Sequence, residues 1–177
     1  MSLQLLLIGG GHAHLGVLEL LARRQRSGID VTLVSASSAQ VYSGMLPGHL
    51  AGHYTYEQCA IPLDPLCETA RADFVRGRVV SLDLEQRVAL TETGGMLPFD
   101  IVSIDIGPGP DQATISGLQH ALSVRPIEQL VSTWRMLEQR FAGTPLPQTL
   151  AVIGGGPAGT ELVAAMAWRA REANLQL

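Results

Sequence analysis

Two glycine-rich turns, each placed directly after an apolar run, constrain the fold of this 177-residue chain more than any other feature. The first begins at Gly9 after the apolar residues 5–8, and the second begins at Gly154 after the apolar residues 150–153. Each turn leads into a segment with a helical pattern. In such an arrangement, backbone N–H groups and a helix N-terminus bind the pyrophosphate of a dinucleotide. The two turns therefore predict two dinucleotide sites in one protein.

The pattern over the first hundred residues predicts an α/β fold of the Rossmann-like type. Residues 4–8 and 29–34 are predicted strands and residues 13–26 a helix, which together form a βαβ unit with a parallel sheet. Alternating apolar residues predict two antiparallel strands over 78–84 and 87–93, which form a small β-meander.

Further segments complete the predicted organisation. Residues 35–56 show no regular period, so we predict a long irregular stretch there, and such loops are often functional. The other predicted elements are a short helix over 61–71, a strand over 99–106 that ends at the Gly-Pro breaker 107–110, a helix over 126–141 with one apolar face, a linker at 143–147, a strand over 149–153 and a helix over 158–174.

These elements group into three predicted sections. Residues 1–110 form the N-terminal part of a first dinucleotide-binding domain, residues 111–147 connect it onward, and residues 148–177 begin a second Rossmann unit, which we expect to be truncated. The helix of a truncated unit would lack the sheet that it normally covers. We therefore expect exposed apolar surface there and association into homo-oligomers through it.

The charged residues argue against several classes of function. All twelve positive charges are arginine, so the chain has no lysine for a Schiff base or for a phosphate-binding P-loop. Basic residues are scattered and the formal net charge is −4, which argues against a nucleic-acid partner. No apolar stretch reaches the roughly 18 residues of a membrane-spanning helix, and the N-terminus lacks a signal-peptide pattern. We expect a cytoplasmic protein with no transmembrane segment.

The two cysteines, Cys59 and Cys67, are spaced unlike the pairs that form local redox disulfides. We expect both to be small, buried, largely apolar residues.

The first turn comprises Gly9, Gly10, Gly11, His12, Ala13 and His14. Gly9 permits the tight bend, and Gly11 lets the backbone approach a phosphate. His14 occupies the place of the third glycine in the usual pattern, so we expect it to push the helix away from the strand or to delay the helix start. We expect His12 and His14 to contact phosphate or pack near it, and we predict no metal site. Ser35 stands where an acid usually ends the second strand, and its hydroxyl can still bind a ribose.

The second turn comprises Gly154, Gly155, Gly156, Pro157, Ala158 and Gly159, and it matches the complete glycine pattern. Pro157 suits the first position of a helix, and Glu161 follows two residues after the last glycine. The acid that distinguishes NAD from NADP would fall about twenty residues further on, beyond Leu177. The sequence therefore leaves the choice between the two nucleotides open.

Four segments resemble the pyridine nucleotide–disulfide oxidoreductase superfamily, whose members use FAD and NAD(P)H. The segments are 9–14 (GGGHAH), 41–48 (VYSGMLPG), 99–107 (FDIVSIDIG) and 154–161 (GGGPAGTE). The likeness is nearest to type II NADH dehydrogenases and to the flavoprotein module fused to selenide, water dikinase. It covers essentially the whole chain, which would correspond to about the first half of a full family member.

The resemblance implies a set of cofactor contacts. The FAD pyrophosphate would lie on the first turn, with Ser35 near the adenosine ribose and Val79 beside the adenine. The loop Ser43, Gly44, Met45, Leu46 and Pro47 would approach the isoalloxazine ring. Asp105, Ile106 and Gly107 take the place of the family's Ala-Thr-Gly turn. Residues 154–159 would bind NAD(P)H, and Glu161 would act catalytically where flavin and nicotinamide meet.

The implied activity is hydride transfer from NAD(P)H to FAD, in which the protein mainly positions the two rings. The sequence leaves the electron acceptor, a small molecule, unknown. The resemblance is compatible with a quinone or with a selenium or sulfur species, and with a fused or associated selenide, water dikinase as a partner. The family's later Gly-Asp motif at the flavin is absent from these residues, so we expect the isolated chain to turn over poorly.

Two alternatives stay open. A non-catalytic nucleotide-binding or interaction module is favoured by the missing ribose acid and the missing third glycine of the first turn. A single-flavin monooxygenase would explain the first turn only, and the complete second turn argues against it.

Overall fold

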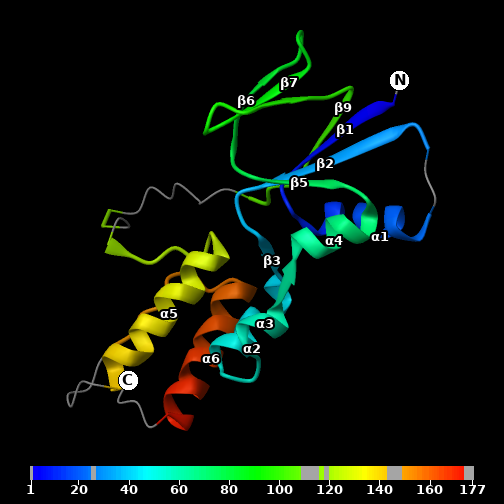
Figure 1. Cartoon of the computed structure of the whole chain (residues 1–177). Coiled ribbons are helices and arrows are strands. Elements are labelled where there is room, and N and C mark those ends of the chain that lie inside the picture. The colour runs from blue at the N-terminus through cyan, green and yellow to red at the C-terminus, as the bar shows by residue number, and fades with distance from the viewer. Residues whose placement is uncertain (1, 25–26, 109–115, 118–119, 143–148, 174–177) are drawn as a thin grey trace. The chain divides into compact units, whose positions relative to one another are not determined.

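The chain divides into two compact units. The first comprises Met1–Gln40 and Ile61–Pro108, and the second comprises Val41–Ala60 and Gly109–Leu177. The computed structural model describes residues 2–24, 27–108, 116–117, 120–142 and 149–173 (Figure 1). The predicted linker at 143–147 and the end of the predicted breaker, 109–110, lie outside the described residues. The boundaries of the cofactor domains stay a prediction.

A parallel sheet forms the centre of the first unit, with the strand order β5-β2-β1-β9. The strands are β1 (Leu3–Ile8), β2 (Ile29–Ser35), β5 (Asp73–Arg76) and β9 (Ile101–Ile104). Leu7 of β1 lies opposite Leu33 of β2 on one side and Ser103 of β9 on the other. The α/β fold with a parallel sheet is therefore confirmed. β5 has no counterpart among the predicted strands, because four residues are too few to show a period.

The alternation of side chains along β1 places a separate core on each face of the sheet. On one face, Leu7 packs beneath α1 (His12–Arg23) and α4 (Leu63–Ala70), which lie side by side in Figure 1. On the other face, Leu6 and Val34 pack with residues of the antiparallel strands. A strand that is covered on both faces is apolar along its whole length, as β1 is.

Three antiparallel strands form the meander in the order β6-β7-β8. They are β6 (Val79–Asp83), β7 (Val88–Thr91) and β8 (Met96–Pro98). The first two correspond to the predicted hairpin. β8 has no counterpart among the predicted strands: after Gly94 and Gly95 the chain reverses and pairs with β7 a second time.

Helices dominate the second unit. They are α2 (Leu46–Leu50), α3 (Tyr56–Cys59), α5 (Ile127–Ala142) and α6 (Pro157–Glu172), with a 3-10 helix at Ser43–Met45. Their shared core includes Leu50, Leu130, Trp134, Leu162 and Met166. The apolar face predicted for 126–141 is thus confirmed as a core stripe. The short strands β3 (Ala39–Val41) and β4 (Ala60–Pro62) form a separate two-stranded sheet.

The prediction of an irregular stretch over 35–56 is wrong. The segment contains β3, the 3-10 helix and α2, and it ends at the cap of α3. The Thr55 hydroxyl accepts from the Gln58 amide, and the Gln58 side chain accepts from the Thr55 amide, so the two residues form a capping box. The Thr-x-x-Gln pattern of this capping box was visible in the sequence. The other elements of the segment have only three to five residues, which is too short for a periodicity argument.

The prediction of a strand over 149–153 is also wrong for the described residues. None of them pairs with this segment in a sheet, although α6 follows it as expected. A strand forms only beside a hydrogen-bonding neighbour, and apolar patterning alone does not supply one. The predicted end of this helix at residue 174 lies outside the described residues.

Among the described helices, none combines the length and the apolar character needed to cross a bilayer.

Candidate functional site

The first glycine turn lies at the carboxyl end of β1, where the strand order changes direction. The chain goes from β1 through α1 to β2 on one side, whereas β9 lies on the other side of β1. In open α/β sheets, ligands bind in the crevice at such a point. Gly9 has a φ of +93°, and its amide donates to the Val34 carbonyl at 2.8 Å. This turn therefore lies where open α/β sheets bind their ligands.

Asp105, at the end of β9, is bound directly to the first turn. Its carboxylate Oδ2 accepts from the amides of Ala13 at 2.8 Å and His14 at 3.3 Å. Its main-chain carbonyl accepts from the Gly11 amide at 3.1 Å, and its own amide donates to Ile8 at 2.8 Å. The residue expected to lie near FAD therefore serves as the side-chain cap of α1.

The glycines of this turn are needed for contacts within the protein. A Cβ on Gly9 would overlap the Asp105 carbonyl, and a Cβ on Gly11 would overlap the Asp105 carboxylate. A Cβ on Gly10 would lie 2.7 Å from a methyl carbon of Leu63, which α4 packs against the turn. Close approach of other chain segments therefore accounts for all three glycines before any ligand is considered.

The prediction that His14 delays the start of the helix is wrong, whereas its displacement of the helix from the strand stays a prediction. α1 begins at His12, and the imidazole of His14 is 2% exposed beneath the turn. Its Nδ1 lies 2.6 Å from the Gly9 carbonyl, and its Nε2 lies 2.9 Å from the Ser103 hydroxyl. A carbonyl only accepts, so Nδ1 carries a proton and donates. Ser103 was missed by the sequence analysis, although a serine within the apolar strand 101–104 was a visible signal.

Two other residues of the predicted FAD site lie within the first unit. Ser35 ends β2 and is buried, and its hydroxyl accepts from the Ser37 amide at 3.3 Å. Val79, at the start of β6, packs against the core below the meander. Next to Asp105, Ile106 is largely exposed, and Gly107 follows it. The roles of these residues toward a ribose or an adenine stay predictions.

The loop predicted to approach the flavin ring belongs to the second unit. Leu46 is 4% exposed and Met45 packs beside it, so both contribute to the helical core. Ser43 and Gly44 are exposed, and Pro47 lies in the first turn of α2. The approach of this loop to a flavin stays a prediction.

The second glycine turn has the same sequence pattern and a more open surface. Gly154 has a φ of +109°, and a Cβ on Gly159 would overlap the Gly154 carbonyl, so the helix approaches the turn closely. Among the described residues, no atom beyond the chain neighbours lies within 4 Å of a Cβ built on Gly155 or Gly156. Pro157 occupies the first turn of α6, as predicted. Ala158 on the same turn and Glu161 on the next turn of α6 are both exposed.

The two cysteines are free and buried, as predicted, and they belong to different units. Burial, together with the nearby Asp64, raises the pKa of the Cys67 thiol to about 11. Burial also raises the pKa of Cys59. Neither residue is therefore a thiolate at neutral pH, which argues against a nucleophilic or redox role. In the described part of the chain, no three acidic, histidine or cysteine side chains form a group suited to a metal ion.

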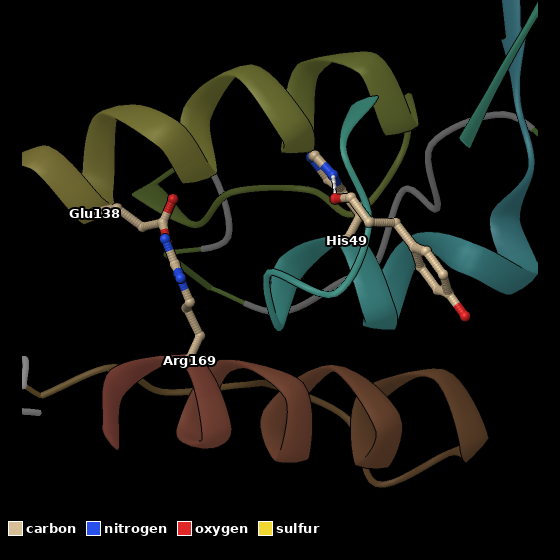
Figure 2. Close-up of polar contacts among 4 residues, drawn as sticks. His49, Glu138 and Arg169 are labelled. Carbon is tan, nitrogen blue, oxygen red and sulfur yellow. Dashed lines mark hydrogen bonds and ion pairs between the residues drawn. The ribbon is translucent and has the colours of Figure 1, made fainter. Parts of the chain in front are cut away.

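Polar contacts within the second unit join its helices. Figure 2 shows Arg169 of α6 reaching Glu138 of α5, with Nε and Oε1 at 2.5 Å. In the same figure, His49 of α2 lies with its Nδ1 2.9 Å from the Tyr54 carbonyl. Burial raises the pKa of Tyr56 in α3, and so do the nearby Glu128 and Glu57. The Arg169–Glu138 pair therefore joins α6, which follows the second turn, to α5, which precedes it.

The backbone path of the first turn fits a dinucleotide, but several of its N–H donors already have a partner within the protein. The strand, the positive φ of Gly9 and the extended Gly11 cap have the required form. However, the amides of Gly11, Ala13 and His14 already donate to Asp105. A bound pyrophosphate would need donors of this kind.

Comparisons with known proteins agree with the fold. Sulfide-quinone reductase of Aquifex aeolicus is 26% identical over 165 residues, which cover 89% of this chain and 37% of that protein. Type II NADH:quinone oxidoreductase of Staphylococcus saprophyticus is 23% identical over 160 residues, which cover 86% of this chain and 40% of that protein. The structure of NDH2 from Plasmodium falciparum in complex with NADH has a TM-score of 0.76 at 18% identity, over 94% of this chain and 37% of that one.

The chain thus spans well under half the length of the curated relatives that it matches. The model of the family described as pyridine nucleotide-disulphide oxidoreductase matches residues 3–175, which is nearly the whole sequence. The chain belongs to the pyridine nucleotide-disulphide oxidoreductase family.

Proposed function

We propose that this chain carries the FAD site and the nicotinamide-binding glycine turn of an FAD-dependent NAD(P)H oxidoreductase. The observation that carries the proposal is the position of the first turn, between β1 and α1 at the point where the strand order reverses. The second turn supplies a separate, open helix N-terminus. Family membership and the named activities of the relatives support the same proposal.

The residues of the chain have distinct roles in this proposal. The amides at the start of α1 bind the FAD pyrophosphate, and Ser35 binds the adenosine ribose. Residues 43–47 contact the flavin ring. The amides after Gly156 bind the pyrophosphate of NAD(P)H, and Glu161 positions the nicotinamide. When bound, FAD supplies hydride acceptance from the nicotinamide and transfer of electrons onward.

The electron acceptor in this proposal is a small molecule of the quinone class. Two relatives act on quinones by name, a sulfide-quinone reductase and a type II NADH:quinone oxidoreductase. Selenium or sulfur species are the second choice. The proposal of a selenium or sulfur acceptor rests on the sequence resemblance alone, and so does an association with selenide, water dikinase. A cytoplasmic location rests on the composition of the chain alone.

A non-catalytic nucleotide-binding module is the second candidate function. The observation that favours it is the Asp105 carboxylate, which holds donors that a pyrophosphate would use. In this case the chain would bind a nucleotide weakly and transfer no hydride.

The test is an absorbance and fluorescence titration of the purified 177-residue chain with FAD, followed by NADH. We expect FAD fluorescence to be quenched on binding and the flavin bands to bleach slowly after NADH is added. Binding of FAD without bleaching of the flavin bands by NADH would favour the non-catalytic nucleotide-binding module. Failure to bind either FAD or NADH at millimolar concentration would overturn the proposed function.

The matched variants for this titration are Gly156→Asp and Gly16→Ala. A carboxylate at the cap of α6 repels a pyrophosphate, so we expect the first variant to lose NADH binding and to keep FAD binding. Gly16 lies inside α1, where a Cβ would meet no described atom within 4 Å beyond its own helix. We expect the Gly16→Ala variant to bind both nucleotides as the native chain does.

A further inference from the structure

The N-terminus of α1 already holds an anion that belongs to the chain. The first amides of a helix have no partner within the helix, and the helix dipole favours a negative charge beside them. In this protein, the Asp105 carboxylate lies there and accepts from the amides of Ala13 and His14. The carboxylate comes from the end of β9, more than ninety residues further along the chain. Its charge and position are those of a phosphate ligand.

The carboxylate is held in place by the strand that carries it. The Asp105 amide donates to Ile8 at 2.8 Å, and the Asp105 carbonyl accepts from Gly11 at 3.1 Å. Two residues earlier, Ser103 lies within hydrogen-bond distance of the buried His14 ring. The contact between the Asp105 carboxylate and the α1 amides is therefore fixed by backbone hydrogen bonds between Asp105 and the turn.

A phosphate and this carboxylate exclude one another. Each N–H makes one strong hydrogen bond, and two negative groups sharing the same donors repel. The carboxylate also lies against Gly11, where a Cβ would overlap it. Gly11 is the position at which the backbone of a dinucleotide site approaches the pyrophosphate.

We propose that Asp105 is a built-in competitor for the phosphate position of the first glycine turn. This inference rests on the proposed function, because it concerns the site at which FAD would bind. A dinucleotide binds α1 only after the Asp105 side chain rotates away, so the native chain binds more weakly than one without the carboxylate. Asp105 is half-buried and is followed by the exposed Ile106 and Gly107, so the rotation in this proposal is toward solvent.

The experiment compares Asp105→Ala and Asp105→Asn with the native chain in titrations with FAD and with ADP, which also carries a pyrophosphate. Fluorescence quenching gives the FAD affinity, and calorimetry gives the ADP affinity. We expect both variants to bind each nucleotide about tenfold more tightly, because one charge-assisted contact no longer has to be broken. We also expect lower melting temperatures without nucleotide, since α1 loses all or part of its cap.

Asp100→Ala is the matched control. The Asp100 carboxylate accepts from the Gln4 amide at 2.8 Å, so it is also an acid next to β9 that binds backbone, but outside the glycine turn. We expect this variant to lose stability without any gain in nucleotide affinity. A purely structural role for Asp105 would produce the same result as the control.

Equal or weaker binding of both nucleotides by a folded Asp105→Asn variant would overturn the inference. If Asp105→Ala does not fold, the Asn variant decides alone, because it retains an oxygen acceptor. Tighter ADP binding without any FAD binding would support the inference and overturn the proposed flavin function. Binding of neither nucleotide by any variant would overturn both.

Discussion

The two glycine turns have nearly the same sequence pattern and different surroundings. Around the first turn, Asp105 and Leu63 occupy the space beside Gly9, Gly10 and Gly11. Around the second, no described atom beyond the chain neighbours lies within 4 Å of a Cβ on Gly154, Gly155 or Gly156. A glycine motif therefore specifies the local path of the backbone. Whether its amides are free for a ligand depends on segments from elsewhere in the chain.

The largest expected effect comes from comparing Gly9→Ala with Gly154→Ala. Both residues have positive φ, so both substitutions introduce backbone strain. Only at Gly9 does the new Cβ also overlap another segment, the Asp105 carbonyl. We expect losses in the free energy of unfolding of about 3 kcal/mol for Gly9→Ala and about 1 kcal/mol for Gly154→Ala, measured by urea denaturation. Equal losses would contradict the contrast between a closed and an open turn.

A second prediction concerns pH and the helix that covers Gly10. The pKa of Cys67 in α4 is raised from 9.0 to about 11 by burial and by Asp64. Because the folded protein keeps this proton to a higher pH than the unfolded chain, the stabilisation is complete below about pH 9. It is lost as the pH rises toward 11, by about 2–3 kcal/mol.

The measurement is urea denaturation at pH 8 and pH 11 for the native chain and for Cys67→Ala, which has no thiol at this position. We expect the native chain to lose more stability over this range than the variant. The same slope in both would show that the thiol does not titrate as its burial requires.

The buried histidine of the first turn should have a smaller effect. His14→Ala leaves the Gly9 carbonyl and the Ser103 hydroxyl without their partner and opens a cavity, so we expect a loss of about 2 kcal/mol. Ser103→Ala removes one of the two hydrogen bonds, and we expect a loss of about 1 kcal/mol.

Nitrogen NMR of the histidine ring checks the geometry directly. The structure requires a proton on Nδ1, because that atom faces a carbonyl. A neutral ring with its proton on Nε2 alone would contradict the contact with Gly9.

The smallest expected effect is a gain in stability. Gly16→Ala in α1 places a methyl group where it meets no described atom within 4 Å outside its own helix. Alanine favours a helix interior over glycine by about 0.5–1 kcal/mol, so the melting temperature should rise by a few degrees. A lower melting temperature would show that the surface of α1 is covered at this position.

Much of the fold could be predicted from the sequence where the signal is local. The strand, turn and helix at residues 3–23 were predicted to within a few residues, because an apolar run, glycines and a helical period occur in immediate succession. The helix Ile127–Ala142 was predicted from its apolar face. The short elements β5, β8 and α2 were missed, because three to five residues carry too little pattern.

The candidate site was less predictable than the fold. The glycines and Asp105 were identified by position, but the contact between Asp105 and the amides of α1 joins residues more than ninety apart. The buried His14 ring likewise contacts Ser103, which is almost as remote in the sequence. Sequence spacing cannot show which donor has a partner when the partner comes from another strand.

By itself, the sequence determined the two glycine turns, the helices that follow them and the apolar strands of the parallel sheet, because backbone conformation and side-chain alternation are local properties. Only the tertiary structure decided that the first turn is closed and that, among the described residues, the second is open. It also decided that residues 149–153 have no strand partner among the described residues. Hydrogen-bond partners and space around a backbone are supplied by distant segments, and their arrangement exists only once the chain has folded.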